Sequence, residues 1–582
     1  MLIALINSDS TVTDTTVTYE IPNVIQLCFH PDMIQQLYGE FTLHPAAYDH
    51  RLVETFFQSP FALLDFGSGQ LSLVSRKGKD PRHTTLFLNG HRLDNPLFGY
   101  ANLAQISPHV IDVIAVSDEC LGSACVNLNS KVNTYAIPFS VVQFTWGDFD
   151  THVYTIDFTR PITNEFGLYL NGSYVETEGY RTNSKYDLGS LYANFYYNTI
   201  VPMRFDVVYS TTDYGIPGSV LNSLEAQGTN QLTDICLVLG NDNHHAALYY
   251  TVNSIEQMNI VADTSFENIV RNYGIDINNK SNIYGYELNY RLMGALSDVT
   301  SDLIGEHTIR SLNGRIALRK TYERLGASVG ARAELNNENE FLHAPYANVG
   351  FSFSESTRIS ATVSRDFRSP SLLELYGPAN LSHLYYWTHG NSELVSEYHR
   401  SQELSFHYGT SFVTFYKQDY EDFIVAQPDS GNYITSQNVD SWQKTGVEGH
   451  AAVTLQLAHD TSNQSSTAIS TGLSGNYLFS GYSLQFIPRS NARAFVTFER
   501  KTPRFGVGLT LRGEYVGERQ DRVGQVHGDN VALLSFIGTL RFVTLSFIFR
   551  VDNVLDETYA YINGYENAPR NGRFSIKWEF WD

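Results

Sequence analysis

The chain has 582 residues, of which 42% are apolar, 13% aromatic and only 17% charged, and its formal net charge is −22. The acidic balance excludes a general nucleic-acid binder, which needs a basic face, and a polybasic membrane-surface protein. The 37 Tyr and 35 Phe residues exclude a solvated, disordered chain. By length, about four ordinary domains or one very large β-structure remain.

Residues 1–137 show weak, mixed periodicity. Short apolar segments alternate with stretches rich in Gly, Asn and Asp, such as 61–69 and 89–99. This pattern predicts a small α+β globule. The first ten residues lack the basic region of a complete signal peptide. Cys120 and Cys125 are close enough in sequence for a disulfide, two free thiols are the equal alternative, and the spacing offers no zinc site.

A period of two residues dominates from about residue 139 onward. Residues 325–335 place Leu, Ala and Val on one face and Gly, Ser, Arg and Glu on the other, and residues 507–515 repeat this alternation. The polar face keeps Arg and Glu over about 440 residues, with short turn-like gaps, which predicts about 22 strands of a transmembrane β-barrel. The Tyr and Phe surplus fits its aromatic girdles. A soluble propeller or a string of sandwiches is the alternative, although no blade-like repeat is visible.

The two parts of the chain fit together as one fold. A barrel of about 22 strands is too wide to be filled by its own side chains, so the N-terminal globule is expected to occupy the lumen. The prediction is an all-β membrane protein, an antiparallel transmembrane β-barrel with an N-terminal α+β plug domain. Its expected parts are a tail at residues 1–20, the plug at 21–137 and the barrel at 138–582.

Several motifs resemble those of the TonB-dependent outer-membrane receptor family. In the barrel part they lie at residues 214–218, 365–377, 389–391, 446–448, 515–519 and 552–574. Three N-terminal segments follow the order of the family's plug, at residues 67–72, 84–93 and 103–116. The sequence GSGQLS at 67–72 is most similar to the plug of vitamin B12 (cobalamin) transporters.

This resemblance implies a receptor in the outer membrane of a Gram-negative bacterium. It would bind a scarce metal chelate outside and import it to the periplasm, using inner-membrane proton-motive force delivered by TonB. The implied partners are TonB with its energising complex, lipid and lipopolysaccharide, and the small chelate. The resemblance implies a monomer with no covalently bound cofactor and no nucleic-acid partner.

The segment that TonB would grip is a short extended stretch near the N-terminus, the TonB box. Strand addition favours β-branched residues in an extended backbone. The stretch similar to this box is Asp14, Thr15, Thr16, Val17 and Thr18. A merely Thr-rich tail is the alternative interpretation.

The resemblance also implies ion pairs between plug and barrel. Arg76 lies where the first plug arginine of the family falls, and Glu403 and Glu448 match its barrel partners. Three separately solvated charges are the alternative. The chain departs from the family after residue 116, because residues 117–130 lack the second plug arginine and carry a degraded glycine-rich run.

Ligand contacts in this family come from the plug apices and the extracellular loops. The matching apex residues are Ser68, Gly69, Gln70, Leu71, Asn95, Phe98, Gly99 and Tyr100. The matching loop residues are Tyr385, Tyr386, Trp387 and His389. Their aromatic rings can stack on a flat chelate, although packing within the loop or the girdle is the alternative.

Three cargo classes compete. Cobalamin is favoured by GSGQLS, a ferric siderophore is the commonest cargo of the family, and heme is suggested by His383 and His389, since imidazole ligates iron. The net charge of −22 makes anionic cargo the harder case. The calcium-binding acidic loop of cobalamin transporters has no counterpart at residues 180–187, so calcium is not expected.

Two other functional classes compete with the receptor. A passive or adhesion barrel that has lost TonB coupling is favoured by the divergent segment 117–130. An enzyme is disfavoured, because the sequence contains no HExxH or CxxC motif and no phosphate-type glycine loop.

Overall fold

The computed structural model describes residues 41–581 except for gaps at 68, 121–122, 133–136, 220–221, 242, 260–263, 337–339, 379–388, 429–433, 461–463, 482–485, 521–525, 528–529 and 563. The predicted tail and TonB box therefore lie outside the described residues. The N-terminal elements are β1 Phe41–Leu43, α1 Leu52–Thr55, η2 Phe56–Gln58, β2 Ala62–Asp65, β3 Ser72–Ser75, η3 Pro81–His83, β4 Thr84–Leu88, β5 His91–Arg92, η4 Leu103–Gln105, η5 Pro108–Val110, β6 Ile111–Cys120 and β7 Ser123–Ser130.

These N-terminal elements, called the plug below (residues 41–130), form a small sheet with short helical turns. Five strands pair in the order β1-β6-β7-β4-β5, and β2 and β3 form a separate hairpin. Three of the short helices, η3, η4 and η5, begin at a polar N-cap residue, and η3 and η5 also have Pro in the first turn. Asp80 and Ser107, for example, each accept a backbone N–H just ahead of a proline-led turn. The predicted α+β globule is thus mainly β.

The remaining strands build the barrel. They are β8 Phe139–Gly147, β9 Thr151–Pro161, β10 Phe166–Thr177, β11 Tyr186–Tyr197, β12 Met203–Ser219, β13 Asn222–Gly240, β14 His244–Asn259, β15 Thr264–Ile283, β16 Tyr286–Ser301, β17 Gly305–Tyr322, β18 Leu325–Leu335, β19 Phe341–Ser352, β20 Thr357–Arg368, β21 Glu397–Tyr408, β22 Ser411–Pro428, β23 Ile434–Asp460, β24 Ser465–Ser480, β25 Ser490–Lys501, β26 Phe505–Val516, β29 Val531–Phe542, β30 Leu545–Asp552 and β31 Asn571–Trp581. Helix α2 (Leu372–Tyr376) and the short hairpin β27 (Arg519–Gln520) and β28 (Val526–His527) lie in loops between strands.

The 22 barrel strands form one closed antiparallel sheet, in which β31 pairs with β8. Alternation on each strand separates lumen from exterior. On β21, His399 and Ser401 are buried, whereas Leu404, Phe406 and Tyr408 are about half exposed on the outer face. The predicted fold class is confirmed, and the four-domain estimate from length is wrong because one closed sheet absorbs most of the chain. Among the described residues, no helix is long and apolar enough to cross a membrane.

The two rims of the barrel differ in loop length. One rim has turns as short as 284–285 and 323–324, and the other carries the long connections 369–396, 517–530 and 553–570. Outer-membrane barrels have short periplasmic turns and longer extracellular loops. We therefore assign the rim with the long connections to the outside of the cell.

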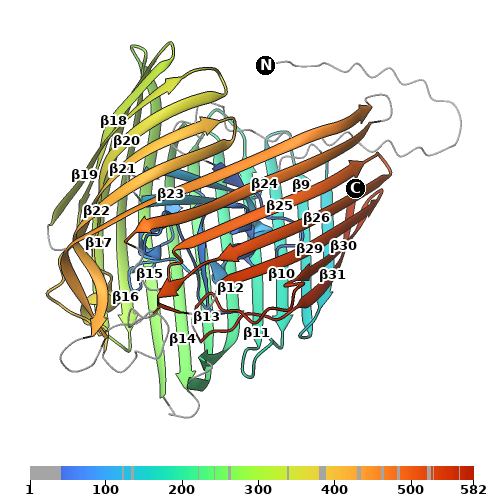
Figure 1. The fold of residues 1–582 in the computed structure, drawn as a ribbon, viewed down its shortest axis with the longest axis horizontal. Helices are drawn as coiled ribbons and strands as arrows, with labels where there is room; N and C mark the ends of the chain where they lie inside the picture. The colour runs from blue at the N-terminus through green and yellow to red at the C-terminus, as the bar shows by residue number, and fades with distance from the viewer. Residues whose placement is uncertain are drawn as a thin grey trace, which may run out of the picture.

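The plug lies inside the barrel, where Figure 1 shows its blue strands behind the orange wall strands. Its apolar core is continuous with inward-facing barrel residues, since Tyr192, Val208 and Leu232 belong to the same buried cluster as the plug's Leu88 and Val126. The lumen is thus occupied, as predicted. In the same plug sheet Cys125 is disulfide-bonded, which removes the alternative of a free thiol at this position.

Candidate functional site

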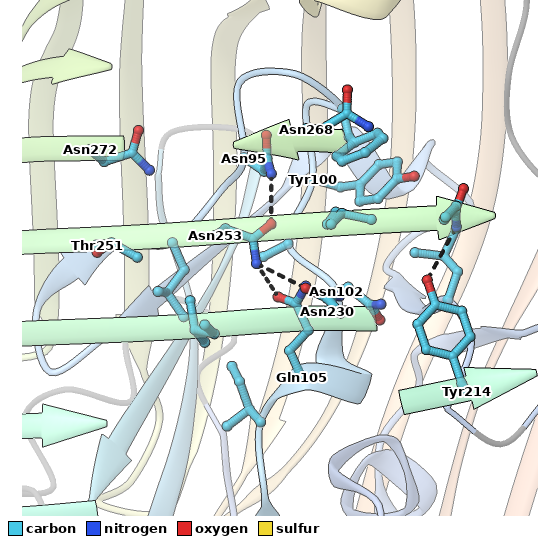
Figure 2. A pocket seen from close by; sticks show the side chains of 18 residues that line it. Asn95, Tyr100, Asn102, Gln105, Tyr214, Asn230, Thr251, Asn253, Asn268 and Asn272 are labelled. Carbon is cyan, nitrogen blue, oxygen red and sulfur yellow. Dashed lines mark hydrogen bonds between the residues drawn. The ribbon is translucent and has the colours of Figure 1, made fainter. Parts of the chain in front are cut away.

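A cavity that opens to solvent lies between the plug and barrel strands β12–β15 (Figure 2), and its empty space, including the open part, is about 930 Å³. On the plug side it is lined by the segments around Leu71 and 93–106. On the barrel side its residues lie toward the ends of β12–β15 that reach the extracellular rim. The cavity is therefore placed where a ligand arriving from outside would meet plug and barrel together.

The polar lining of this cavity consists mainly of side-chain amides. Eight of its 18 residues are Asn or Gln, and none of the 18 is charged. These amides are Asn95, Asn102, Gln105, Asn230, Asn253, Gln257, Asn268 and Asn272. Leu71, Leu93, Phe98, Tyr100, Ile106, Leu232 and Ile255 supply most of the apolar lining.

Asn253 on β14 connects the plug to the barrel wall within this cavity. It accepts from Asn95 Nδ2 at 3.1 Å and donates to Gln105 Oε1 at 3.2 Å and Asn230 Oδ1 at 3.3 Å, as Figure 2 shows. One barrel side chain is thus bonded to two separate plug segments. A ligand that displaces any of these bonds would alter the contact between plug and wall.

The plug apex at 95–98 is also bonded to an extracellular connection. Backbone amides of Leu372 and Leu373 in α2 donate to the carbonyls of Pro96 and Leu97, at 3.2 and 3.1 Å. Glu374 completes a capping box with Ser371 at the start of α2. Burial opposes the charge of Glu374, but Arg368 and Arg82 lower its pKa to about 2. The loop helix is therefore anchored to the apex that lines the cavity.

The predicted ligand residues are only partly brought together. Leu71, Asn95, Phe98 and Tyr100 line the cavity, whereas the sequence reasoning missed its barrel side. Gly69 and Gly99 instead pack against neighbouring side chains, and Gln70 is buried beside Gly67. His389 does not line this cavity, and its backbone pairs with β23. Ser68, Tyr385, Tyr386 and Trp387 lie outside the described residues, as does His383.

Arg76 and Glu448 form a buried ion pair across the plug–barrel boundary. Arg76 Nη2 and Nε donate to Glu448 Oε1 at 2.7 and 3.1 Å, and the side chains are 2% and 0% exposed. Glu403 instead accepts from Lys77 Nζ at 2.7 Å. Sequence reasoning missed Lys77, although it lies in the cationic run 76–79 and could have been found there as a substitute for the missing second arginine.

A third ionic contact between plug and barrel also joins a plug cation to a barrel carboxylate. His91 Nε2 and Asp234 Oδ1 are 2.8 Å apart, both side chains are fully buried, and Thr251 Oγ1 donates to the same carboxylate oxygen at 2.7 Å. Burial alone would lower the pKa of His91, but Asp234 raises it to about 10. The plug histidine therefore carries a positive charge at neutral pH.

A further network, centred on α1, reverses this polarity, because the plug supplies carboxylates and the barrel supplies arginines. Arg550 lies 2.7 Å from Glu54 and 3.6 Å from Asp49, and Arg573 lies 3.5 Å from Glu54. Burial opposes ionisation of Glu54, yet the two arginines lower its pKa well below the usual value. A second cavity adjoins this network and is lined in part by these charges, and its empty space, including the part open to solvent, is about 1280 Å³.

No group of three or more His, Cys, Asp or Glu side chains able to hold a metal ion occurs within the described parts of the chain. The cavity lining likewise contains no His, Cys or Met. The cavity can therefore offer a ligand hydrogen bonds and apolar contact from these 18 residues, but no metal coordination by imidazole or sulfur.

This architecture is similar to that of known outer-membrane receptors. The protein-family model described as TonB dependent receptor-like, beta-barrel, matches residues 127–554 of the chain. The siderophore receptor PirA from Acinetobacter baumannii is similar in structure, with a TM-score of 0.73, 12% identity, and coverage of 94% of this chain and 99% of that chain. No curated protein matches the chain.

Two further solved structures show the same fold. A mutant of the ferric enterobactin receptor PfeA from Pseudomonas aeruginosa, in complex with enterobactin, has a TM-score of 0.72 and 14% identity, and covers 94% of this chain and 100% of that chain. The copper transporter OprC has a TM-score of 0.74 and 13% identity, with coverage of 93% and 98%. These neighbours are receptors and transporters, not enzymes.

Proposed function

The chain belongs to the TonB-dependent receptor family, and from that premise we propose that it imports a scarce small-molecule chelate across the outer membrane. The closed barrel with its apolar outer face is an outer-membrane structure of the Gram-negative type. The ligand would bind at the 930 Å³ cavity. This cavity carries the proposal because plug and barrel wall both line it, so a bound ligand contacts the part that must move.

Transport would then require the plug to be shifted against its wall contacts. The pair Arg76–Glu448 and the pair Lys77–Glu403 are both largely buried. Removing one partner of a buried pair costs about 3–5 kcal/mol, so these contacts oppose displacement of the plug from the barrel wall. A pull by TonB on the segment at residues 14–18 would supply this energy, by strand addition to the N-terminal tail.

The test measures binding and uptake separately. Cells that produce the full chain, or a variant lacking residues 14–18, are supplied with candidate chelates in the presence and absence of TonB. We expect uptake that requires both TonB and residues 14–18, with binding to the purified protein unchanged by the deletion. Uptake that is the same without TonB would refute energy coupling.

A passive or adhesion barrel is the second candidate, because residues 117–130 depart from the family's plug pattern. Such a barrel would conduct ions without a high-affinity ligand. The buried plug contacts at Glu448 and Asp234 instead favour a closed lumen. Planar-bilayer recordings distinguish the two, since the receptor is expected to show no stable open current.

A further inference from the structure

We propose that the 930 Å³ cavity selects an electrically neutral ligand with one apolar face and a rim of amide, carbonyl or hydroxyl groups. This inference deepens the proposed function and rests on it, since it assumes that this cavity is the receptor's binding site. It uses charge and surface chemistry to distinguish between the chelates that such a receptor could carry.

The first support is the balance of donors and acceptors in the lining. Each Asn or Gln side chain presents both a carbonyl oxygen and an NH₂ group. Eight of them line the cavity without a charged neighbour in the lining. A ligand surface that mixes donors and acceptors can satisfy such a wall, whereas an ion would lose its hydration without gaining a counter-ion.

The second support is a pair of unsatisfied amide atoms on β15. Asn268 Nδ2 and Asn272 Oδ1 are buried without a hydrogen-bond partner, and their residues are 1% and 7% exposed. Asn268 Oδ1 already accepts from Ser301, at 2.5 Å. Because buried polar groups in proteins are nearly always bonded, one free donor and one free acceptor that lie on one strand and line the cavity are available to a ligand with the complementary pair.

The third support is the charge behind the cavity wall. Thr251 lines the cavity and donates to Asp234, whose charge is balanced by the buried His91. The wall therefore presents no net local charge at this point. The chain as a whole carries −22, which repels an anionic ligand at long range. An anionic ferric chelate would need Arg or Lys as charge-assisted donors, and the lining has neither.

The apolar face of the ligand follows from the plug side of the cavity. The rings of Phe98 and Tyr100 lie stacked, with centroids 5.6 Å apart and planes 21° from parallel. Together with Leu71 they offer an apolar floor opposite the amides of β13–β15. A ligand with one apolar face can pack here while its polar rim meets the barrel wall.

The test is a binding panel on the full chain in lipid nanodiscs. The neutral probes are cyanocobalamin and an uncharged ferric trihydroxamate, and the anionic probes are ferric enterobactin and hemin. We expect at least one neutral probe to bind 100-fold more tightly than either anionic probe, with an affinity that changes less than 2-fold between 50 and 500 mM NaCl. Tighter binding of an anionic probe, weakened by salt, would overturn the inference.

Variants at Asn272 make the test specific to the cavity. Asn272→Ala should weaken the neutral probe about 3- to 10-fold, as expected for one lost hydrogen bond. Asn272→Lys should weaken it further and strengthen ferric enterobactin at least 10-fold. Asn289 on β16 is the matched control, because it is also 7% exposed and also has an unpartnered Oδ1, yet does not line the cavity. Equal effects of the Asn272 and Asn289 variants would refute the assignment.

The outcomes separate this inference from the proposed function. If an anionic chelate binds and is taken up in a TonB-dependent manner, the proposed function stands and the neutral-ligand inference fails. If none of the four probes binds and none is taken up, both fail for these chelates. If a neutral probe binds and Asn272→Ala weakens it, the inference holds whether or not TonB is required for uptake.

Discussion

Replacing Glu448 by Ala tests the plug–barrel contact most directly. The substitution leaves the buried guanidinium of Arg76 without the carboxylate to which it donates at 2.7 and 3.1 Å. Because both side chains are at most 2% exposed, solvent cannot replace the lost partner. Removing one member of such a pair costs about 3–5 kcal/mol, and we expect the free energy of plug opening to fall by this amount.

Hydrogen–deuterium exchange of the full chain in nanodiscs measures this change. Exchange of the amides in β3, next to Arg76, should accelerate by roughly 10²- to 10³-fold or more, since about 1.4 kcal/mol corresponds to a factor of ten. Amides of the barrel wall should exchange as before. The double variant Arg76→Met with Glu448→Met should recover most of the protection, because a well-packed apolar pair can replace a buried ion pair.

The matched control is the exposed pair Lys501–Glu499, which is 2.7 Å long with side chains 60% and 43% exposed. Glu499→Ala should change stability by no more than about 1 kcal/mol. Unchanged exchange in β3 of the Glu448→Ala protein, or equal acceleration by Glu499→Ala, would refute the reasoning.

Three further predictions concern the plug. Lys77→Met should lower the free energy of plug opening by about 1–3 kcal/mol. It should therefore accelerate β3 exchange less than Glu448→Ala does, because Glu403 keeps a second donor, a serine hydroxyl. The raised pKa of His91, about 10 against 6.5 unfolded, contributes plug stability that is full below pH 6.5 and lost as pH rises toward 10, which exchange measured across that window would detect. Gly69→Ala should weaken ligand binding, because the new Cβ would clash with the ring of Tyr186 and lie 2.9 Å from Tyr214, which lines the cavity, at a φ of +70°.

Each of these predictions has its own control. Plug exchange in the Lys77→Met protein that equals or exceeds that of Glu448→Ala would contradict the first. His91→Gln should remove the pH dependence between 6.5 and 10, and its persistence would exclude His91 as the cause. Gly409→Ala introduces a similar backbone strain, at a φ of +57°, with no atom within 4 Å of the new Cβ, so it should leave binding intact.

The sequence by itself determined the barrel, because the alternation of polar and apolar residues is a local property of each strand. It also predicted an occupied lumen from the width of the barrel, and the family from motifs in their order. The resemblance to the family implied that Arg76 faces Glu403 and Glu448, and the structure pairs it with Glu448. The mainly β character of the plug was not predicted, because one-turn helices and short strands have nearly the same local pattern.

Only the tertiary structure decided which inward-facing residues meet. Asn253 is one of many lumen-facing amides, and the register of β14 together with the position of the plug brings it to Asn95, 158 residues away. In the same way Glu403 meets Lys77, and not a second plug arginine, because the plug turn presents that cation to β21. Period two specifies the face of a strand, whereas pairing across the lumen depends on barrel register and plug position, which no local pattern contains.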